Sequence, residues 1–593
     1  MATLPLRRIL GLTTGLLALA LAACAGPMDR TTEEELHDAL IASNRAFVDS
    51  VASGPVIELQ RTKSEVDAEL SPQRRAELDR ISGAQSYLGK PLLPGRDLMG
   101  HSNAPGVLLS LQQAIHMAVK HSVDVQQARL SPAISQTQVT QAQAAFDAVL
   151  FSNLSYDDLD TPQPGTGAYG DQQSQTLNVT TGIKKLLTTG GTITAQTVFN
   201  RIAQEPSIFS TFGSSPFTYY DASLQVGITQ PLLQGFGQDV NRAQVLLAQS
   251  ARAQSLTDLK STLLDVVSTV ESDYWKLYFA QSRLLIQQRL LDRTLEDYKR
   301  IKQREGFDVN PVRKTEAGSF VELRRAEVIR ARQDVRNASD TLKRLLGSPN
   351  LPLAGETLIL PSDTPADLPI TFSLLDAVTT ALRDRPELQK ALLQIKDAAV
   401  RQRVADNARL PQLNIGATLR YNGVSPTSDT GSDNGSIDKA YGSLTDGNYI
   451  DYLLAGQFQV PIGNRGPEAL YQQRTLEREQ AVVTYEKAAQ DVVLQVKQTM
   501  RTLITSYELI GAARAARRAA ADNLRAIERQ EEVGVELTPE FLLDLKLNSQ
   551  QRLADAETQE VQALTDYNSA VANFYRTLGT LLQRNGIEFH DVK

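Results

Sequence analysis

Few residues in this 593-residue chain are placed where they could carry out chemistry. Cys24 is the only cysteine, so the chain cannot form an intramolecular disulfide or a cysteine-based zinc site. The five histidines are scattered, and His116 and His121 are spaced too far apart to share one helical face as metal ligands. No arrangement of residues suggests a nucleophile–base pair. The sequence therefore favours a protein that is not an enzyme and that uses no metal or cofactor.

Phosphate and nucleic-acid sites are also disfavoured. Residues 83–91, GAQSYLGKP, have five residues between the glycines where a phosphate-binding loop has four, and Pro91 stands in place of Ser or Thr. The net charge of −7 gives no overall basic footprint for nucleic acid. Five arginines crowd one predicted helix, namely Arg514, Arg517, Arg518, Arg525 and Arg529. We interpret this cluster as a solvated helix face, with a site for an anionic partner as the alternative.

The first residues have the pattern of a secretory signal peptide. Arg7 and Arg8 precede an apolar stretch, and small residues lead to Cys24. The segment Leu21-Ala22-Ala23-Cys24 resembles the lipobox of bacterial lipoproteins, which implies cleavage before Cys24 and lipidation of its thiol. In the sorting rule of that family, Ala25 after the cysteine indicates the outer membrane rather than retention at the inner membrane. An ordinary signal peptide with an incidental cysteine is the alternative.

The chain repeats itself. Residues 109–128 and 372–391 align at one constant offset, which pairs Leu111 with Leu374, Ala114 with Ala377, and Ala118 with Ala381. The sequence predicts a signal peptide at 1–23, an N-terminal extension at 24–107, a first repeat at 108–347, a proline-rich linker at 348–371, a second repeat at 372–583 and a tail at 584–593. We could not assign a function to the N-terminal extension.

Very long helices are the strongest physical signal. Between Gln238 and Glu305 there is neither Gly nor Pro, which corresponds to roughly 100 Å of helix at 1.5 Å per residue. A matching run from Glu468 to Val533 contains only Gly511 as an interruption. Apolar residues also occur as adjacent pairs, such as Leu263-Leu264. Because adjacent residues lie about 100° apart on a helix, each helix has two apolar flanks, which suits the wall of a hollow helical barrel.

Strand-like segments precede both long helices. Residues 220–229 and 410–421 alternate apolar and polar residues, the pattern of transmembrane β-strands between lipid and a polar lumen. A half-buried strand in a soluble sheet has the same pattern and remains the alternative. Further strands are predicted at 148–157 and 449–460, and residues 176–200 suggest an additional hairpin around the turn TTGG.

These features in this order resemble the TolC-like outer-membrane efflux family. The resemblance covers about 108–583 and includes the segments QVGITQPLLQGFGQ, QFQVPIGNRGPEAL, DYWKLYFA and VGVELTPEFLLD. It implies a mixed α and β membrane protein in which duplicated helix–β-hairpin–long-helix repeats form, as a homotrimer, an outer-membrane β-barrel continuous with a long periplasmic α-helical barrel. Four strands per chain are usual in this family, and six are the alternative, which gives a barrel of 12 or 18 strands.

The family resemblance also suggests functional residues at the second helical tip. Gly534, Val535, Leu537 and Thr538 would form the knob on which a periplasmic adaptor docks. Asp544 resembles an acidic position that the family turns toward the lumen, where three copies would form a periplasmic gate. Pairing of Asp544 with a basic neighbouring helix is the alternative.

The expected function is an outer-membrane channel-tunnel, the passive exit duct of a tripartite efflux pump or type I secretion system. Its implied partners are two further copies of the chain, a periplasmic adaptor (membrane fusion protein), an inner-membrane transporter and outer-membrane lipid. The alternative is a periplasmic coiled-coil lipoprotein that acts as an adaptor or a structural bridge in the envelope. The sequence does not identify the exported substrate or the particular transporter.

Overall fold

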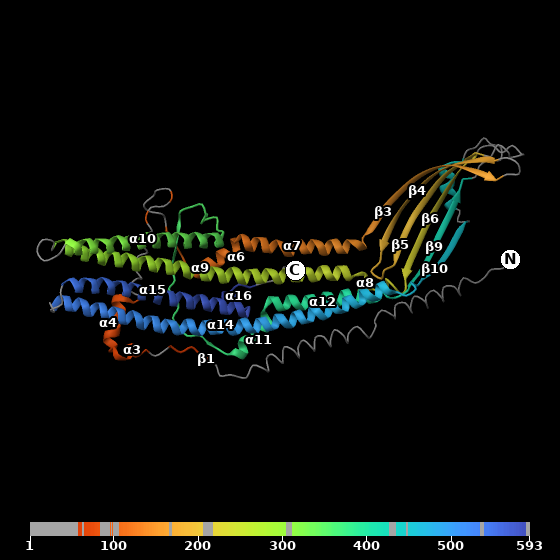
Figure 1. The fold of residues 1–593 in the computed structure, drawn as a ribbon. Helices are drawn as coiled ribbons and strands as arrows, with labels where there is room; N and C mark the ends of the chain where they lie inside the picture. The colour runs from red at the N-terminus through yellow and green to blue at the C-terminus, as the bar shows by residue number, and fades with distance from the viewer. Residues whose placement is uncertain are drawn as a thin grey trace. The chain divides into compact units, whose positions relative to one another are not determined.

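A computed structural model describes residues 57–61, 64–83, 95, 98, 106–164, 169–205, 217–303, 311–425, 435–445, 449–533 and 539–588 (Figure 1). The predicted signal peptide, Cys24 and the predicted tip residues Gly534, Val535, Leu537 and Thr538 lie outside these ranges. The described residues form two compact units. One holds 134–253 and 393–483, and the other holds the remaining described residues.

The first unit is built around one antiparallel sheet of six strands in the order β10-β9-β6-β5-β4-β3. The strands are β3 (Ala148–Pro164), β4 (Tyr169–Leu186), β5 (Thr192–Glu205), β6 (Phe217–Pro231), β9 (Gln412–Val424) and β10 (Ile450–Gln459). The short helices η1 (Ala144–Phe146) and α8 (Gln238–Asn241) flank the sheet in sequence. Residues 176–200, the additional hairpin, belong to this sheet, so the chain supplies six strands rather than four.

The strand register separates apolar from polar residues across the whole sheet. One row of paired residues crosses all six strands and is apolar throughout, in the order Leu150, Ile183, Ala195, Val226, Leu419, Tyr452. The next row, on the opposite face, contains Gly182 and is otherwise mostly polar, in the order Phe151, Gly182, Gln196, Gln225, Arg420, Asp451. Because side chains alternate between faces along a strand, this register gives the sheet one apolar and one largely polar face.

Helix α13 (Ile437–Thr445) covers only one end of the apolar face, where Tyr441 stacks on Phe199 with ring centroids 6.4 Å apart. Farther along the same face, side chains remain exposed, with Leu150 at 73% and Tyr452 at 79%. A soluble sheet would bury such a row against another layer.

The helices have close to their predicted lengths. They include α7 (Val123–Gln143), α9 (Ala243–Gln303), α10 (Pro311–Leu346), α12 (Pro386–Asn407), α14 (Arg465–Val533), α15 (Pro539–Leu578) and α16 (Leu581–Arg584). Helix α14 continues through Gly511. The first long run is instead divided between α8 and α9 at Arg242, and the Asn241 side chain donates to the carbonyls of Gly235 and Gly237 in the preceding loop. Among the described residues, no helix is long and apolar enough to span a membrane.

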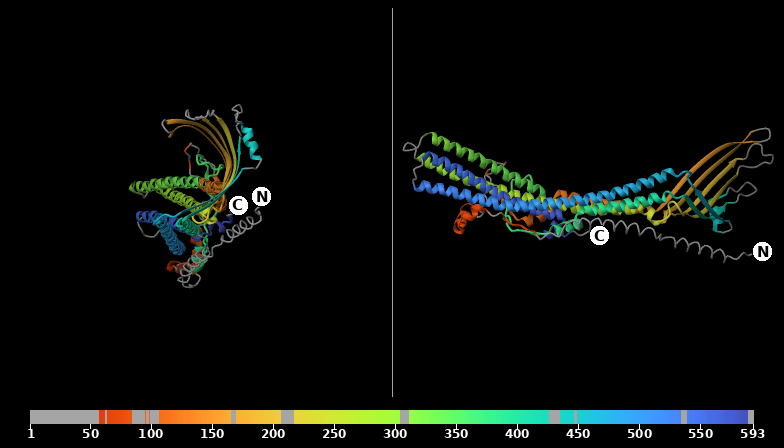
Figure 2. Two further views of the ribbon diagram at one scale, coloured as in Figure 1. Left: turned by 90° about the vertical axis from the view of Figure 1, so that its right-hand side faces the viewer. Right: turned by 60° about the horizontal axis from the view of Figure 1, so that its bottom comes forward.

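The second unit contains two helical hairpins, with α9 beside α10 and α14 beside α15 (Figures 1 and 2). The largest apolar cluster lies between α9 and α10 and includes Trp275, whose ring packs edge-on against Tyr274 at 5.3 Å. Trp275 is thus a buried packing residue of this cluster. The Tyr274 hydroxyl donates to the Leu109 carbonyl at 2.9 Å, which ties α9 to β2 (Gly106–Leu109).

The proline-rich segment between the repeats is more ordered than a linker. It contains β7 (Leu358–Pro361), which pairs in parallel with β2 (Gly106–Leu109), and β8 (Thr371–Phe372), which pairs with β1 (Ile57–Glu58). Leu358, Ile359 and Leu360 are buried, so the hydrophobic effect fixes this segment onto the helices.

Two short helices begin in the same way at the aligned positions. Ser110 caps α6 (Leu111–His121) and Ser373 caps α11 (Leu374–Asp384), each by accepting from the backbone N–H three residues on. Gly347 and Gly579 follow the ends of α10 and α15 with positive φ. A Cβ at Gly347 would lie 2.5 Å from the carbonyl oxygen of His121, and one at Gly579 would lie 2.9 Å from that of Asp384. Each glycine thus allows a long helix to end against the last residue of a short one.

Candidate functional site at the helical tips

Both helical hairpins turn near prolines. Helix α10 begins at Pro311 and α15 at Pro539, and proline suits the first turn of a helix because its missing N–H would have no helical acceptor. The tip residues between Val533 and Pro539 lie outside the described residues, so the predicted docking knob stays a prediction.

Asp544, the predicted gate residue, is exposed on α15. Its carboxylate accepts a hydrogen bond from the Asn548 side chain, one turn along the same helix, at 3.0 Å. Among the described residues of this chain, no Lys or Arg forms an ion pair with it. The carboxylate is therefore available to water or to another molecule, as a gate would require.

The basic residue nearest in sequence is engaged elsewhere. Lys546 is buried, and its ammonium group donates to Asp297 on α9 at 2.9 Å and to Glu531 on α14 at 2.8 Å. Gln550 donates to the other oxygen of Asp297 at 2.9 Å. Burial by itself would lower the pKa of Lys546, but the hydrogen bonds with Glu531 and Asp297 outweigh it and raise the pKa. This cluster fastens α15 to both neighbouring long helices within a few turns of the tip.

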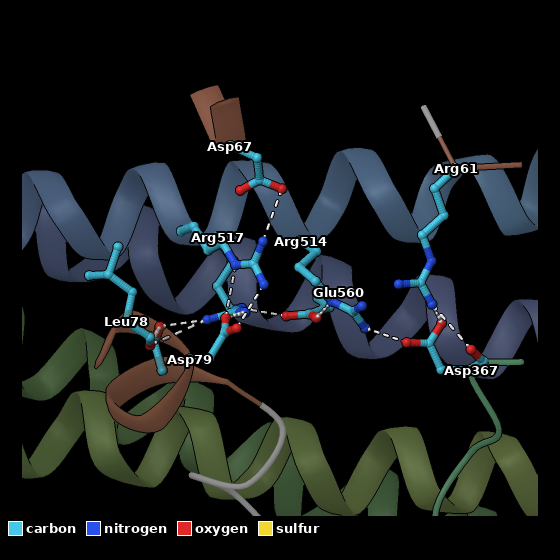
Figure 3. Close-up of polar contacts among 10 residues, drawn as sticks. Arg61, Asp67, Leu78, Asp79, Asp367, Arg514, Arg517 and Glu560 are labelled. Atoms are coloured by element: carbon cyan, nitrogen blue, oxygen red, sulfur yellow. Dashed lines mark hydrogen bonds and ion pairs between the residues drawn. The ribbon is translucent and has the colours of Figure 1, made fainter. Parts of the chain in front are cut away.

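The arginine cluster of α14 is not a solvated face, so that interpretation was wrong. Arg517 is 1% exposed, and its Nε donates to Glu560 on α15. Its two terminal nitrogens donate to Ser82 Oγ at 2.8 Å and to Asp79 at 2.6 Å (Figure 3). Asp79 and Ser82 belong to α4 (Pro72–Ser82) in the N-terminal extension. The anionic partner of this cluster is thus a segment of the same chain.

Other arginines of the cluster extend this network. Arg518 binds both oxygens of Asp79, at 2.9 and 2.7 Å, and Asp67 at 3.0 Å. Arg514 donates to Glu560 and to Asp367, each at 2.8 Å. Asp67 lies on α3 (Glu65–Glu69). The sequence showed the arginines, but it did not show which of its many acidic residues fold against them.

Glu557 is a buried acid beside this network that has a different environment. It is 3% exposed, and its Oε1 atom has no hydrogen-bond partner among the described residues. Burial raises the pKa of Glu557 to about 7, although the charges of Arg293, Arg289 and Arg517 act in the opposite direction. The folded protein therefore holds this carboxyl group in its neutral form more readily than the unfolded chain does.

We expect the Glu557→Gln variant to become more stable than the native chain as pH rises. Below about pH 4.5 the carboxyl group of Glu557 is protonated in both the folded and the unfolded chain. Between about pH 4.5 and 7 it is ionised in the unfolded chain but still protonated in the folded chain, so the native chain loses stability over this range. The advantage of the variant should grow by about 2–3 kcal/mol between pH 5 and pH 8. Urea unfolding in detergent, followed by circular dichroism, measures this difference.

Asp555→Asn is the matched control, because it removes an exposed charge from the same helix. If the free energies of unfolding of Glu557→Gln and Asp555→Asn change with pH in the same way, the raised pKa of Glu557 does not contribute to stability.

Comparisons with known proteins agree with this architecture. The family model described as outer membrane efflux protein matches residues 377–580. No curated protein matches the chain.

Several solved structures share the fold. The Campylobacter jejuni CmeC outer membrane channel is 14% identical, with a TM-score of 0.56 over 79% of this chain and 86% of that one. The open state of the Neisseria gonorrhoeae MtrE outer membrane channel is 18% identical, with a TM-score of 0.54 over 80% and 89%. The outer membrane protein VceC from Vibrio cholerae is 15% identical, with a TM-score of 0.54 over 79% and 96%.

These comparisons confirm the resemblance that the sequence predicted: residues 377–580 match the outer membrane efflux protein family, and the chain shares the fold of these outer membrane channels.

Proposed function

We propose that the protein is an outer-membrane channel-tunnel that serves as the passive exit duct of a tripartite efflux pump or a type I secretion system. The observation that carries this proposal is the apolar row across all six strands. Most of this row is exposed, and no other described element of the chain covers it. Contact with lipid on this face, and with water on the polar face, would satisfy both sets of side chains.

The same sheet supports assembly as a homotrimer. Strands β3 and β10 lie at the two edges, and neither edge pairs with another described strand. Unpaired backbone groups are costly in hydrocarbon, so a sheet in a membrane must close on itself. Three chains with six strands each would close an 18-stranded barrel, and this larger barrel replaces the 12-stranded one as the expected form.

A charge on the proposed lipid face should disrupt the folded barrel. We expect Leu419→Arg to destabilise it by about 2–4 kcal/mol, the cost of arginine near the middle of a bilayer. Thr418→Arg is the control, because Thr418 points to the opposite face and is paired with Gly227, which has no side chain to crowd it. Heat-modifiable migration on gels after reconstitution into lipid vesicles reports the folded trimer.

If both variants fold equally well, the apolar row does not face lipid. A coiled-coil lipoprotein without a barrel would show no heat-modifiable form in the native chain either.

Lipidation at Cys24 would add an anchor at the same membrane. This part of the proposal rests on the lipobox-like segment and on Ala25, which favours the outer membrane. Mass spectrometry of the mature N-terminus should find a diacylated, N-terminally blocked Cys24, and Cys24→Ala should remove the lipid. A mature chain that begins at another residue would rule out the anchor.

The helical tips are the proposed gate and docking site. The exposed carboxylate of Asp544, repeated in three chains, would form an anionic ring at a narrow opening, which favours cations. Gly534, Val535, Leu537 and Thr538 would form the surface that a periplasmic adaptor binds, and the adaptor would connect the duct to an inner-membrane transporter that supplies the energy.

We expect Asp544→Asn to weaken cation selectivity and block by multivalent cations in planar-bilayer recordings. Asp555→Asn is a close control, because Asp555 lies about three helical turns farther along α15 and so on the same face. Its carboxylate is also exposed and also accepts from a side-chain amide within α15, that of Gln551 at 2.6 Å. If Asp544→Asn leaves both properties as they are in the native channel, Asp544 is not part of the gate.

A further inference from the structure

The strap, defined here as residues 64–83, crosses the second helical hairpin and holds it by two kinds of contact. It consists of α3 and α4, and each helix begins with a serine, Ser64 or Ser71, whose side chain accepts from the backbone of its first turn. These caps and Pro72 at the start of α4 favour the helical conformation of the strap.

The apolar contact is made mainly by Leu78, with the partly buried Leu70 of the strap packed beside it. The Leu78 side chain is fully buried and packs with Ala521 and Leu524 on α14 and with Leu553 on α15. A single leucine therefore touches both helices of the hairpin. Burial of one leucine side chain contributes about 1.5–3 kcal/mol, which is too little to hold a 20-residue segment by itself.

The polar contacts surround Leu78 on the same strap. Arg74 donates to Asp522 at 2.8 and 2.6 Å, Glu77 pairs with Arg525, and Asp79 receives Arg517 and Arg518. Burial alone would raise the pKa of Asp79, but hydrogen bonds from Arg518 and Arg517 lower it. The strap is thus bound to α14 through charges of both signs, which fixes its register as well as its position.

The arrangement around Arg517 links the strap to the packing between α14 and α15. Arg517 pairs with Glu560 on α15, and both side chains are buried. Asp79 and Ser82 complete the hydrogen bonds of the same guanidinium from the strap. With the strap in place, separation of α14 from α15 would leave the carboxylate of Glu560 without its two arginine partners, whereas Arg517 would keep Asp79 and Ser82. Without the strap, Arg517 would lose these two acceptors and depend on Glu560 alone.

We propose that the strap is a latch that keeps α14 and α15 together and so limits movement of the second helical tip. The local part of this inference stands on the contacts above, and its effect on conductance rests on the proposed function as a channel.

Hydrogen exchange followed by mass spectrometry tests the local part. Two variants release the latch in different ways: Asp79→Asn removes the charge that binds two arginines, and Leu78→Asp places a charge in the apolar site. Glu69→Gln is the matched control, since Glu69 is an exposed strap residue for which no ion pair with a described residue is present. We expect exchange at 72–83 to accelerate about tenfold in both variants, with a several-fold acceleration at 514–525 and 553–560.

Two outcomes contradict the latch. If residues 72–83 exchange faster while the exchange rates of 514–525 and 553–560 stay as in the native chain, the strap binds to the hairpin but does not hold α14 and α15 together. If Leu78→Asp fails to accelerate exchange at 72–83, the strap is not a separable element. Salt provides a second measurement on the native chain, because 1 M NaCl should screen the exposed parts of the ion pairs and accelerate exchange at 72–83 several-fold.

Planar-bilayer recordings test the functional part. Asp79→Asn should increase the open fraction of the channel at least twofold over the native chain and over Glu69→Gln. If the native chain conducts but Asp79→Asn matches the control, the latch does not control opening. If the native chain does not conduct at all, the proposed function fails, while the exchange data still decide whether the latch exists.

Discussion

The buried pair of Arg517 and Glu560 is the interaction on which the second helical unit depends. Both side chains are almost completely buried, and an isolated charge in that position would be far too costly to keep. Glu560 accepts from Arg514 as well as Arg517, so one carboxylate sets the register between α14 and α15. The remaining nitrogens of Arg517 need further acceptors, and α4 supplies them from the N-terminal extension. The need to satisfy this guanidinium is therefore one of the interactions that hold α4 on the hairpin.

The first unit obeys a different constraint. Within the described part of the chain, no second layer lies over most of the apolar face of its sheet, so its cohesion comes from backbone pairing and from the pairing of side chains in rows. On the largely polar face the Gln196 side chain donates to that of Gln225 at 3.0 Å, and Asn200 donates to Asp221 at 3.1 Å. Such polar pairs fix the register of the strands without any packed core. A one-residue slip of any strand would place its apolar residues on the polar face.

Much of this fold could be predicted from the sequence, because the signals were local. The long helices follow from runs without Gly or Pro, and the strands follow from alternation, including the hairpin around Gly190 and Gly191. The binding partners of the arginine cluster could not be predicted, since Arg517 and Asp79 are 438 positions apart and charge alone does not select a partner. The same limit applies to Glu557 and Glu560, which lie one turn apart on α15 but differ completely in their hydrogen bonds. At the tips, Asp544 could be located on a helix, but the buried Lys546 cluster beside it could not.

The two helical hairpins differ in the way that charge is buried, and this has a mechanical consequence. Between α9 and α10, the ion pair of Arg283 with Asp334 is only half-buried, so water can replace each partner if the helices separate. Between α14 and α15, Arg517 and Glu560 are almost completely buried, and Arg517 also binds Asp79 and Ser82 of α4. Because Leu78 of α4 packs with residues of both α14 and α15, separation of these two helices would also break contacts of the strap. If the strap acts as the proposed latch, the second hairpin would resist opening more than the first, and the difference would arise from an element that lies outside both predicted repeats.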